Sequence, residues 1–380
     1  MVAVPGLAEA LGVLSRDAVV DVHRVLAVAC EPLPASDLAV YLADLSRQVL
    51  VPLAPGVPAE VIAGTLAGRA FATGEPVTSV REGGVRVWVP VTEQTTRTGV
   101  LAFTVPEAGE EVLAQAALLG LFAGLVTAAA LRVSDLPYLR QAQAVSLPAS
   151  MQWDLLPPLS IRTSSAVIAG ALEPAYDVAG DTFDYAVSDC VLQFAILDAV
   201  GHGLGSTLLA GLAVGAYRHA RRAGQLLPAV HAAIDQALAR HYGDMSFATG
   251  IIARLDMASG RLEWSCAGHP PPLLLRGRKV VAELDREPAL PFGLGGTIPE
   301  PGAHDLERGD AVLLYTDGVV EARTPGGELF GLERLTDLAE REAASGEPLE
   351  ELARRLVRAV VHHQGAGLRD DATLLLVQWL

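Results

Sequence analysis

Four short acidic motifs in the C-terminal half constrain this chain more than any other feature of its sequence. In each motif an aspartate stands beside a glycine or at the end of an apolar run, where a turn can hold a short side chain in a fixed place. Carboxylate oxygens are the ligands that magnesium, manganese and calcium prefer, whereas the thiolates and paired histidines of a zinc or copper site are absent from these positions. The pattern predicts metal-assisted chemistry and favours phosphate as the group acted on. The motifs are Ala179-Gly180-Asp181, Asp198-Ala199-Val200-Gly201-His202-Gly203, Tyr315-Thr316-Asp317-Gly318 and Asp370-Asp371-Ala372-Thr373.

The apolar runs next to these motifs predict strands that begin or end at the acidic residues. The glycines after Asp198 turn the chain into a helix expected from Ser206 to Arg222. We therefore expect the carboxylates at the edge of a sheet, facing a cleft, where a rigid scaffold fixes their positions. The runs are Cys190 to Leu197 before Asp198, Asp310 to Tyr315 before Asp317, and Thr373 to Trp379 after Asp370 and Asp371.

Length and charge bound the class of protein. A chain of 380 residues is longer than an ordinary domain of about 100 to 200 residues, so two domains are expected. Its apolar fraction of 51% is ample for a large core. The net charge of −16 argues against nucleic acid or an anionic membrane as the main partner, because both are bound through clustered Lys and Arg.

The cysteines and the apolar segments favour a cytoplasmic protein. The three cysteines, Cys30, Cys190 and Cys266, lie far apart in the sequence and are odd in number, so no disulfide framework is expected. The N-terminal residues lack the basic region and long apolar core of a signal peptide. The longest apolar stretch, Val112 to Val133, is rich in Ala and is better explained as a buried or dimer-forming helix than as a membrane span.

The chain is expected to divide into residues 1–130, a helical linker and regulatory switch over 131–157, and a domain over 158–380. In the first part, Val85 to Val91 and Gly99 to Val105 are typical of paired strands, and a long helix follows from about Glu110. In the linker, Gln152, Leu155 and Leu156 can join a sensor to an enzyme, although the same residues would also suit ordinary domain packing.

The first part resembles a GAF-type sensor domain of the α/β class. The segments that carry the resemblance are GRAFATGEPV (Gly68 to Val77) and GVLAFTVPEA (Gly99 to Ala108). It implies a module that binds a small ligand or dimerises, and it identifies no ligand. A plain dimerisation domain without a small molecule explains these segments equally well.

The second part resembles the metal-dependent serine/threonine protein phosphatases, in the bacterial branch of sporulation and sigma-factor regulators. Seven motifs occur in the order of that family over most of the C-terminal domain. They are Leu155-Leu156-Pro157, PAYDVAGDTFDYA (Pro174 to Ala186), DAVGHG (Asp198 to Gly203), FATGIIARLD (Phe247 to Asp256), CAGHPPPLLL (Cys266 to Leu275), YTDGVVEAR (Tyr315 to Arg323) and DDATLLLV (Asp370 to Val377).

This resemblance implies an α+β fold for residues 158–380, a sandwich of two antiparallel sheets flanked by helices, with two Mn²⁺ or Mg²⁺ ions at one edge. A water activated between the ions would attack a phosphoserine or phosphothreonine. By motif position Asp198 would bridge both ions. Asp181 and the backbone carbonyl of Ala199 would bind one ion, and Asp317 and Asp370 the other. Asp198 and Asp181 would thus serve catalysis through the activated water.

Four further residues of these motifs are expected to support the ligands rather than to bind metal, namely Gly180, His202, Gly203 and Asp371. The role of His202, either a donor to phosphate or a brace of the turn, stays open, as does that of His269. The resemblance also implies a phosphorylated anti-anti-sigma factor as substrate and a homodimer formed through the first domain and the linker.

Two other enzyme classes disagree with the sequence. The glycines from Gly201 to Gly205 resemble a nucleotide-binding loop, but Ser206 occupies the place of its third glycine. An anti-sigma kinase, which also binds a nucleotide, would need an Asn for its metal site, and the chain has no Asn. Cysteine-based dephosphorylation requires an Arg at the sixth position after a Cys, and no Cys here is followed by one. A phosphatase-like scaffold that binds a partner without catalysis remains the alternative.

Overall fold

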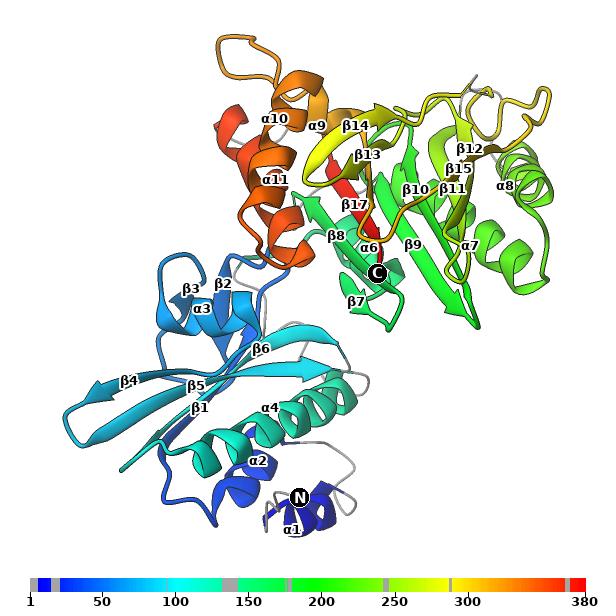
Figure 1. Ribbon diagram of the computed structural model, residues 1–380. Coiled ribbons are helices and arrows are strands. Elements are labelled where there is room, and N and C mark those ends of the chain that lie inside the picture. Colours follow the sequence, from blue (N-terminus) through cyan, green and yellow to red (C-terminus); the bar gives the residue numbers. More distant parts are fainter. Residues whose placement is uncertain are drawn as a thin grey trace. The chain divides into compact units, whose positions relative to one another are not determined.

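The computed structural model describes residues 6–14, 21–93, 95–131, 143–174, 176, 180–241, 246–286, 289–365 and 370–380. The chain forms two compact units, Met1–Ala144 (unit 1) and Val145–Leu380 (unit 2), which we describe separately (Figure 1). Most of the first half of the expected linker, residues 132–142, lies outside the described residues. Its second half belongs to unit 2.

Unit 1 is a six-stranded antiparallel sheet in the order β3-β2-β1-β6-β5-β4. The expected strand pair is confirmed, since β5 and β6 pair along most of their length. The strands are β1 (Ser36–Ala43), β2 (Val49–Pro52), β3 (Glu60–Val61), β4 (Val77–Arg81), β5 (Gly84–Glu93) and β6 (Thr96–Val105), and the helices are α1 (Gly6–Leu14), α2 (Val22–Cys30), α3 (Leu66–Thr73) and α4 (Glu110–Leu131).

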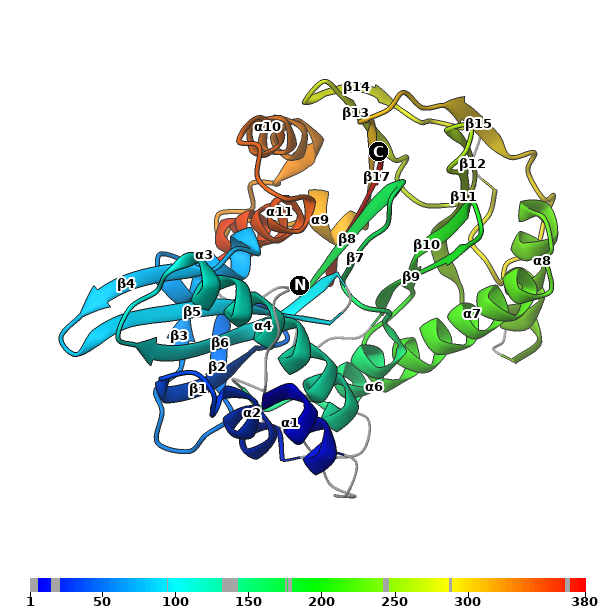
Figure 2. The same ribbon diagram turned by 60° about the horizontal axis from the view of Figure 1, so that its bottom comes forward.

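Alternation along the strands gives this sheet two apolar faces. On β5, Val87, Val89 and Val91 point to the face that packs on α2 and α4, whereas Trp88 points to the face covered by α3. Figure 2 shows α4 lying along the sheet. Helix α3 begins at the N-cap Thr65 and ends at Gly74, which adopts the left-handed conformation with φ 75°, as glycine allows at a helix end. Helices thus cover both faces of the sheet, and the GAF resemblance of unit 1 stays a prediction.

Helix α4 packs closely against β5. A Cβ at Gly120 would lie 2.3 Å from the Pro90 carbonyl oxygen, and one at Gly124 would lie 1.9 Å from that of Thr92, so only glycine permits this approach. By length and composition α4 could also cross a membrane, and 44% of its most apolar window is buried in the structure. Because one side of the helix forms part of the unit 1 core, its apolar composition is explained on that side by packing on the sheet.

Unit 2 is a sandwich of two antiparallel sheets, which confirms the expected α+β fold. One sheet has the order β15-β12-β11-β10-β9 and the other the order β14-β13-β16-β17-β8-β7. The strands are β7 (Ser160–Arg162), β8 (Ala166–Glu173), β9 (Asp181–Ser188), β10 (Val191–Ala199), β11 (Ala248–Asp256), β12 (Arg261–Ala267), β13 (Leu273–Arg276), β14 (Lys279–Glu283), β15 (Gly302–Asp305), β16 (Ala311–Tyr315) and β17 (Ala372–Trp379).

Helices cover the outer faces of both sheets (Figure 1). Helices α7 and α8 pack on the first sheet, and α10 and α11 pack on the second. The core between the sheets is built by alternate residues of each strand, such as Phe194 and Ile196 on β10 and Leu375 and Val377 on β17. The helices are α6 (Leu147–Leu155), α7 (Leu204–Arg222), α8 (Leu227–His241), α9 (Asp317–Val320), α10 (Gly331–Ala344) and α11 (Leu349–Gln364).

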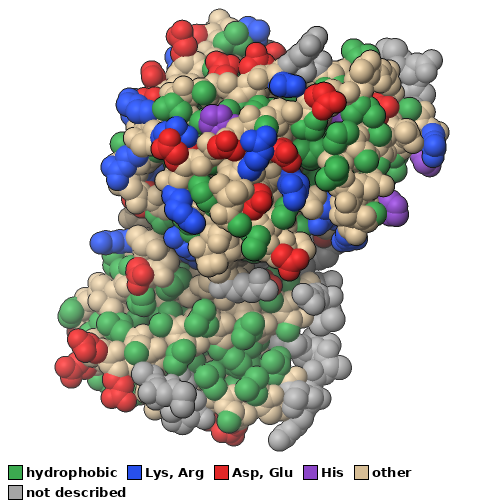
Figure 3. All heavy atoms as spheres, turned by 45° about the vertical axis from the view of Figure 1, so that its right-hand side comes forward, with side chains coloured by type: hydrophobic (Ala, Val, Ile, Leu, Met, Phe, Trp, Pro, Cys, Tyr) green, Lys and Arg blue, Asp and Glu red, His purple; other side chains and the backbone are tan. Residues whose placement is uncertain are grey.

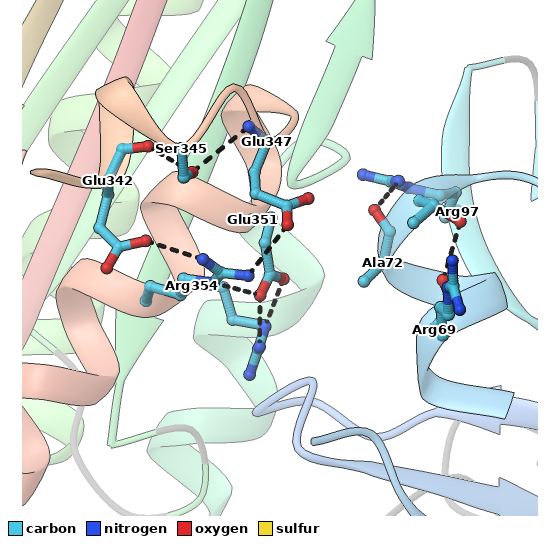
Figure 4. Close-up of polar contacts among 10 residues, drawn as sticks. Arg69, Ala72, Arg97, Glu342, Ser345, Glu347, Glu351 and Arg354 are labelled. Atoms are coloured by element: carbon cyan, nitrogen blue, oxygen red, sulfur yellow. Dashed lines mark hydrogen bonds and ion pairs between the residues drawn. The ribbon is translucent and has the colours of Figure 1, made fainter. Parts of the chain in front are cut away.

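Ion pairs join α10 to α11. Arg355 on α11 binds Glu342 of α10 at 2.9 Å and Glu351, one turn back on its own helix, at 2.7 Å. Glu351 is buried and also pairs with Arg354 at 2.7 Å (Figure 4). Since a buried carboxylate needs a charged partner, these two arginines account for an acidic residue inside the helical layer.

Candidate metal centre

Asp181 and Asp198 lie side by side at one end of the sandwich. Asp181 begins β9, Asp198 is the last residue but one of β10, and the antiparallel register pairs them directly. On β10, Phe194 and Ile196 point into the core between the sheets, so Asp198 extends the same row to its end. Directly opposed residues have Cβ atoms about 5 Å apart, and like charges in that position repel. A cation bound here would offset the repulsion.

Thr316 connects Asp181 to the second sheet. It follows β16, and its Oγ1 donates a hydrogen bond of 2.7 Å to Oδ2 of the buried Asp181. The same Oγ1 accepts a hydrogen bond of 3.0 Å from the backbone N–H of Thr373 on β17. Asp181 is therefore held by groups of both sheets, at the place where the two sheets meet.

Asp371 binds the backbone at the start of β9. Its Oδ2 accepts hydrogen bonds from the backbone N–H groups of Gly180 at 2.8 Å and Asp181 at 3.1 Å. A Cβ at Gly180 would lie 3.0 Å from the carbonyl oxygen of Ala199, so a glycine lets the backbone at this position run close to that carbonyl. The predicted supporting residues Gly180 and Asp371 thus contact the backbone around the predicted ligands Asp181 and Ala199.

Asp317 and Asp370 lie beside this pair. Asp317 is the first residue of α9, and a Cβ at the next residue, Gly318, would lie 1.9 Å from the carbonyl oxygen of Asp371. Glycine at 318 therefore allows the segment after Asp317 to press against the backbone before β17. Asp370 is exposed, and its Oδ1 accepts a hydrogen bond of 3.0 Å from the backbone N–H of Asp371.

The pKa shifts of these carboxyls show that they form one electrostatic group. Burial raises the pKa of Asp198 to about 7, and the charges of Asp317, Asp370 and Asp371 add to the rise. Burial, followed by the charges of Asp198 and Asp371, raises the pKa of Asp181 well above its ordinary value. Burial and the charge of Asp370 also raise the pKa of Asp317. The structure therefore brings the four predicted aspartate ligands together.

The residues present fit hard divalent cations. Their donor atoms are all oxygens, and their negative charges repel one another unless cations or protons offset them. In the described part of the chain Oδ1 of Asp371 is buried without a hydrogen-bond partner. Over the same residues, no three Asp, Glu, His or Cys side chains are already arranged as the ligands of one ion.

The two histidines of the motifs lie in different surroundings. His202 is exposed, in the loop between β10 and α7, and the following Gly203 has φ 74°, a conformation that favours glycine. His269 is buried, and its Nδ1 lies 2.8 Å from Oγ1 of Thr249, the residue paired with Asp198 on β11. Burial lowers the pKa of His269 to about 3, so its ring is neutral near pH 7.

Helix α6 contacts the strand that carries Asp181. Ser146 caps its N-terminus, and the helix ends at Leu155, two residues before Pro157, which disfavours helical conformation in the residue that precedes it. Gln152 is buried, and its Nε2 donates a hydrogen bond to the backbone carbonyl of Asp181. The predicted regulatory residues Leu155 and Leu156 are half-buried and pack on the two clusters that flank the first sheet. The structure thus connects this helix to the predicted metal ligands.

Sequence reasoning missed Arg218 and Asp184, which complete this connection. Asp184 on β9 is buried and accepts two hydrogen bonds from Arg218 of α7, at 2.8 and 3.1 Å. Nη2 of Arg218 also donates a hydrogen bond of 2.7 Å to the carbonyl of Leu155, at the end of α6. Asp184 lies inside the motif from Pro174 to Ala186, and an acidic residue on a predicted strand is a signal of a buried ion pair. Its partner, Arg218, is 34 residues away in the sequence.

Thr316 is the other missed residue. It belongs to the quoted motif Tyr315 to Arg323, yet only its aspartate was singled out. A threonine between a strand and a helix is ordinarily a cap, and Thr316 is indeed the N-cap residue of α9 although it makes no side-chain cap bond. Its hydroxyl binds Asp181 instead.

The family model of stage II sporulation protein E (SpoIIE) matches residues 188–380. Protein IcfG of Synechocystis sp. is 27% identical over 264 residues, which cover 61% of this chain and 39% of that protein. Phosphoserine phosphatase RsbU of Bacillus subtilis is 24% identical over 237 residues, which cover 62% of this chain and 69% of RsbU. The chain thus spans well under half the length of the first of these relatives.

A solved structure shares the fold of the chain's C-terminal part. The RsbU and RsbW domains of Rv1364c from Mycobacterium tuberculosis superpose with a TM-score of 0.51 at 30% identity, covering 58% of this chain and 62% of that chain. The residues matched by the family model lie within unit 2. The match therefore assigns no family to unit 1.

Proposed function

The chain belongs to the stage II sporulation protein E (SpoIIE) family, and we propose that it is a metal-dependent phosphatase acting on phosphoserine or phosphothreonine of a regulatory protein. The observation that carries the proposal is the direct pairing of Asp181 with Asp198, beside Asp317 and Asp370, at one end of the sandwich. The name of the relative RsbU, phosphoserine phosphatase, supports the reaction class.

The chain's own residues would hold and orient the centre. Asp198, with a pKa near 7 and three charged neighbours, has the strongest reason to bind cations and would bridge two of them. Asp181 and the Ala199 carbonyl would complete one position, and Asp317 and Asp370 the other. Thr316 donates to Oδ2 of Asp181, so its hydroxyl fixes which oxygen stays available.

When bound, two Mn²⁺ or Mg²⁺ ions would supply a hydroxide near neutral pH and offset the charge that develops on the phosphate. None of the predicted ligands carries a positive charge that could attract a phosphate. Phosphate binding at this edge would therefore depend on the metal ions. Asp371 would keep the backbone of Gly180 and Asp181 in place through its hydrogen bonds to both N–H groups.

We further propose that α6 couples the centre to unit 1. Gln152 of α6 donates to the backbone carbonyl of Asp181. Arg218 binds both the carbonyl of Leu155, at the end of α6, and the Asp184 side chain on the strand of Asp181. A change in the docking of α6 would therefore act on a predicted ligand. We also propose a phosphorylated anti-anti-sigma factor in the cytoplasm as the substrate, and the name of the relative RsbU, phosphoserine phosphatase, supports a phosphorylated substrate.

Unit 1 would form a homodimer through the outward face of α4. Leu121 and Leu125, four residues apart and therefore on one face, are 48% and 62% exposed. Exposed apolar helix faces mark interaction sites, and a second copy of the chain presents the same face to close the pair.

A phosphatase-like scaffold without catalysis is the second candidate. It is favoured by one observation, that over the described residues no three possible ligands already surround a single point. The retained aspartates favour catalysis, because a scaffold has no need of buried, mutually repelling carboxylates.

One assay separates the two candidates. Phosphate release from a phosphoserine protein is measured in manganese, in chelator, and in manganese with the Asp198→Asn variant. We expect release that needs manganese and falls at least about 100-fold in the variant, the scale on which one preorganised charge-stabilising group acts. Manganese binding by calorimetry without release of phosphate from any substrate would instead favour the scaffold.

A further inference from the structure

Three segments at the metal-centre end of the first sheet carry no charged side chain. They are residues 199–208, 246–249 and 289–299, and none contains Asp, Glu, Lys or Arg. In a chain of which 19% is charged, about five charged residues would be expected among these 25 positions if charges were evenly spread. Surface without charge of either sign is suited to contact with another apolar surface.

Residues 199–208 and 289–299 expose large apolar side chains, which we call the apolar rim. Its members lie at the end of β10, on the first turns of α7 and in the loop before β15, and each is between 39% and 55% exposed. They are Val200, Leu204, Leu208, Leu290, Leu294 and Ile298. In the space-filling view, hydrophobic side chains gather over part of the surface of unit 2 (Figure 3).

Backbone hydrogen bonds show that the rim is continuous with the metal centre. The N–H of Val200, two residues after Asp198, donates to the carbonyl of Phe247 at 3.0 Å, and Ala248 exchanges two hydrogen bonds with Phe292. The strand end that carries Asp198 therefore lies beside residues 247 and 248, and these lie beside the loop of Leu290 and Leu294.

One buried cluster lies beneath all three segments. It includes Ala199 and Leu209, which adjoin Val200 and Leu208 in the sequence, and Ala248 and Phe292, which are hydrogen-bonded to each other. Phe292 is fixed in this core. Leu290 and Leu294 lie two residues before and after it, so the core holds the loop that presents them. The N–H groups of Gly293 and Gly295 also donate to the Asp235 carboxylate on α8, at 2.8 and 3.0 Å.

We propose that the apolar rim is the docking surface for the substrate, and that the substrate is a protein with apolar side chains flanking its phosphoserine. This inference rests on the proposed function and adds the class of substrate surface that the centre accepts. The phosphate would provide the charge that the centre binds through its ions, and the apolar flanks would bury Leu290 and Leu294. Acidic or basic flanks would find no partner on these segments.

The test compares substrates that differ only in their flanks. Two synthetic phosphoserine peptides of equal length and net charge carry Leu and Val, or Ser and Gln, around the phosphoserine, and p-nitrophenyl phosphate reports the centre alone. The full chain is assayed in manganese as wild type, as Leu290→Ser with Leu294→Ser, and as Leu226→Ser. Leu226 is 70% exposed between α7 and α8, outside the rim, and serves as the matched control.

We expect the wild type to prefer the apolar peptide at least about 10-fold in kcat/KM, because its flanks would bury the exposed Leu290 and Leu294. The double variant should lose the preference and keep its rate on p-nitrophenyl phosphate, and Leu226→Ser should behave as the wild type. Equal rates on both peptides in the wild type, or a preference retained by the double variant, would overturn the proposal.

Two further outcomes separate this inference from its premises. If no substrate is hydrolysed, including p-nitrophenyl phosphate, the proposed function fails. The rim is then judged by the fluorescence anisotropy of the labelled apolar peptide, where equal Kd values for wild type and double variant reject it. If the double variant halves the mass of the protein in light scattering, the rim is an interface between two copies and not a substrate site.

Discussion

At the scale of single residues, the centre is a set of carboxyl groups whose simultaneous ionisation costs free energy in the folded protein. Asp198 has a pKa of about 7 in place of its ordinary 3.8, chiefly through burial, and Asp371 is raised to about 6 for the same main reason. The folded state therefore binds protons at these sites more tightly than the unfolded chain does. Its stability must then fall as pH rises, unless cations replace the protons.

The first prediction concerns this pH dependence. In chelator, the stabilisation from protonated Asp198 is fully present below about pH 3.8 and is lost as pH rises through about 7. We expect the Tm in chelator to decrease between pH 5 and 8, and manganese to restore it increasingly toward pH 8, because only the folded chain binds the ions. Thermal unfolding followed by circular dichroism, with and without manganese, measures both trends.

Two variants test whether the acidic group causes the decrease. Asp198→Asn removes one of the interacting charges and should flatten the profile in chelator, so that the variant is more stable than the wild type at pH 8. Asp305→Asn, at a carboxylate 77% exposed on β15, should leave the profile unchanged. A profile of the same slope in Asp198→Asn and wild type would contradict the assignment.

At the scale of elements, Arg218 joins three of them. It connects α7 to β9 through Asp184 and to α6 through the carbonyl of Leu155. Asp184 is buried with a side chain only 2% exposed, and Arg221 is its second cationic neighbour, at 3.6 Å. Removing Arg218 would leave this carboxylate with one distant partner and would free the end of α6.

We predict that Arg218→Met lowers the free energy of unfolding by about 3 kcal/mol, the lower end of the cost of breaking a buried ion pair, because Arg221 remains. Amides of α6 should exchange with deuterium faster than in the wild type. Urea unfolding and hydrogen exchange measured by mass spectrometry give the two readouts.

Matched variants define what this result means. Arg222→Met, an exposed position on the same helix, should change neither readout. Arg218→Met combined with Asp184→Asn should be less destabilised than Arg218→Met alone, since no uncompensated charge stays buried. If α6 exchanges at the wild-type rate in Arg218→Met, the helix does not depend on Arg218 for its docking.

The elements also show what the sequence could and could not predict. Apolar runs located β10, β16 and β17 closely, because alternating burial on a sheet leaves a strong pattern. The same runs placed Asp198 at the end of β10, where the structure has it, and placed Asp317 close to its observed position, two residues after β16 at the start of α9. The contacts of Arg218 and Thr316 depend on how helices and sheets meet across large separations in sequence, and no local pattern records that geometry.

At the scale of the whole molecule, the outward face of α4 provides the strongest reason for a second copy of the chain. Its inner side packs on β5, yet its outer side keeps Leu121 and Leu125 exposed. A symmetric pair would bury both leucines of each protomer, and each buried leucine contributes roughly 1.5–3 kcal/mol before the entropic cost of association.

We predict that the protein has a mass in light scattering of about twice the chain mass of 39.7 kDa, and that Leu121→Glu with Leu125→Glu reduces it to that of one chain. The two-fold symmetry brings four carboxylates together, which adds repulsion to the loss of apolar contact. Val80→Glu is the control, because Val80 is 84% exposed on β4 of the same unit. A wild type with the mass of one chain, or a double variant that stays dimeric, would show that this face of α4 does not join two copies.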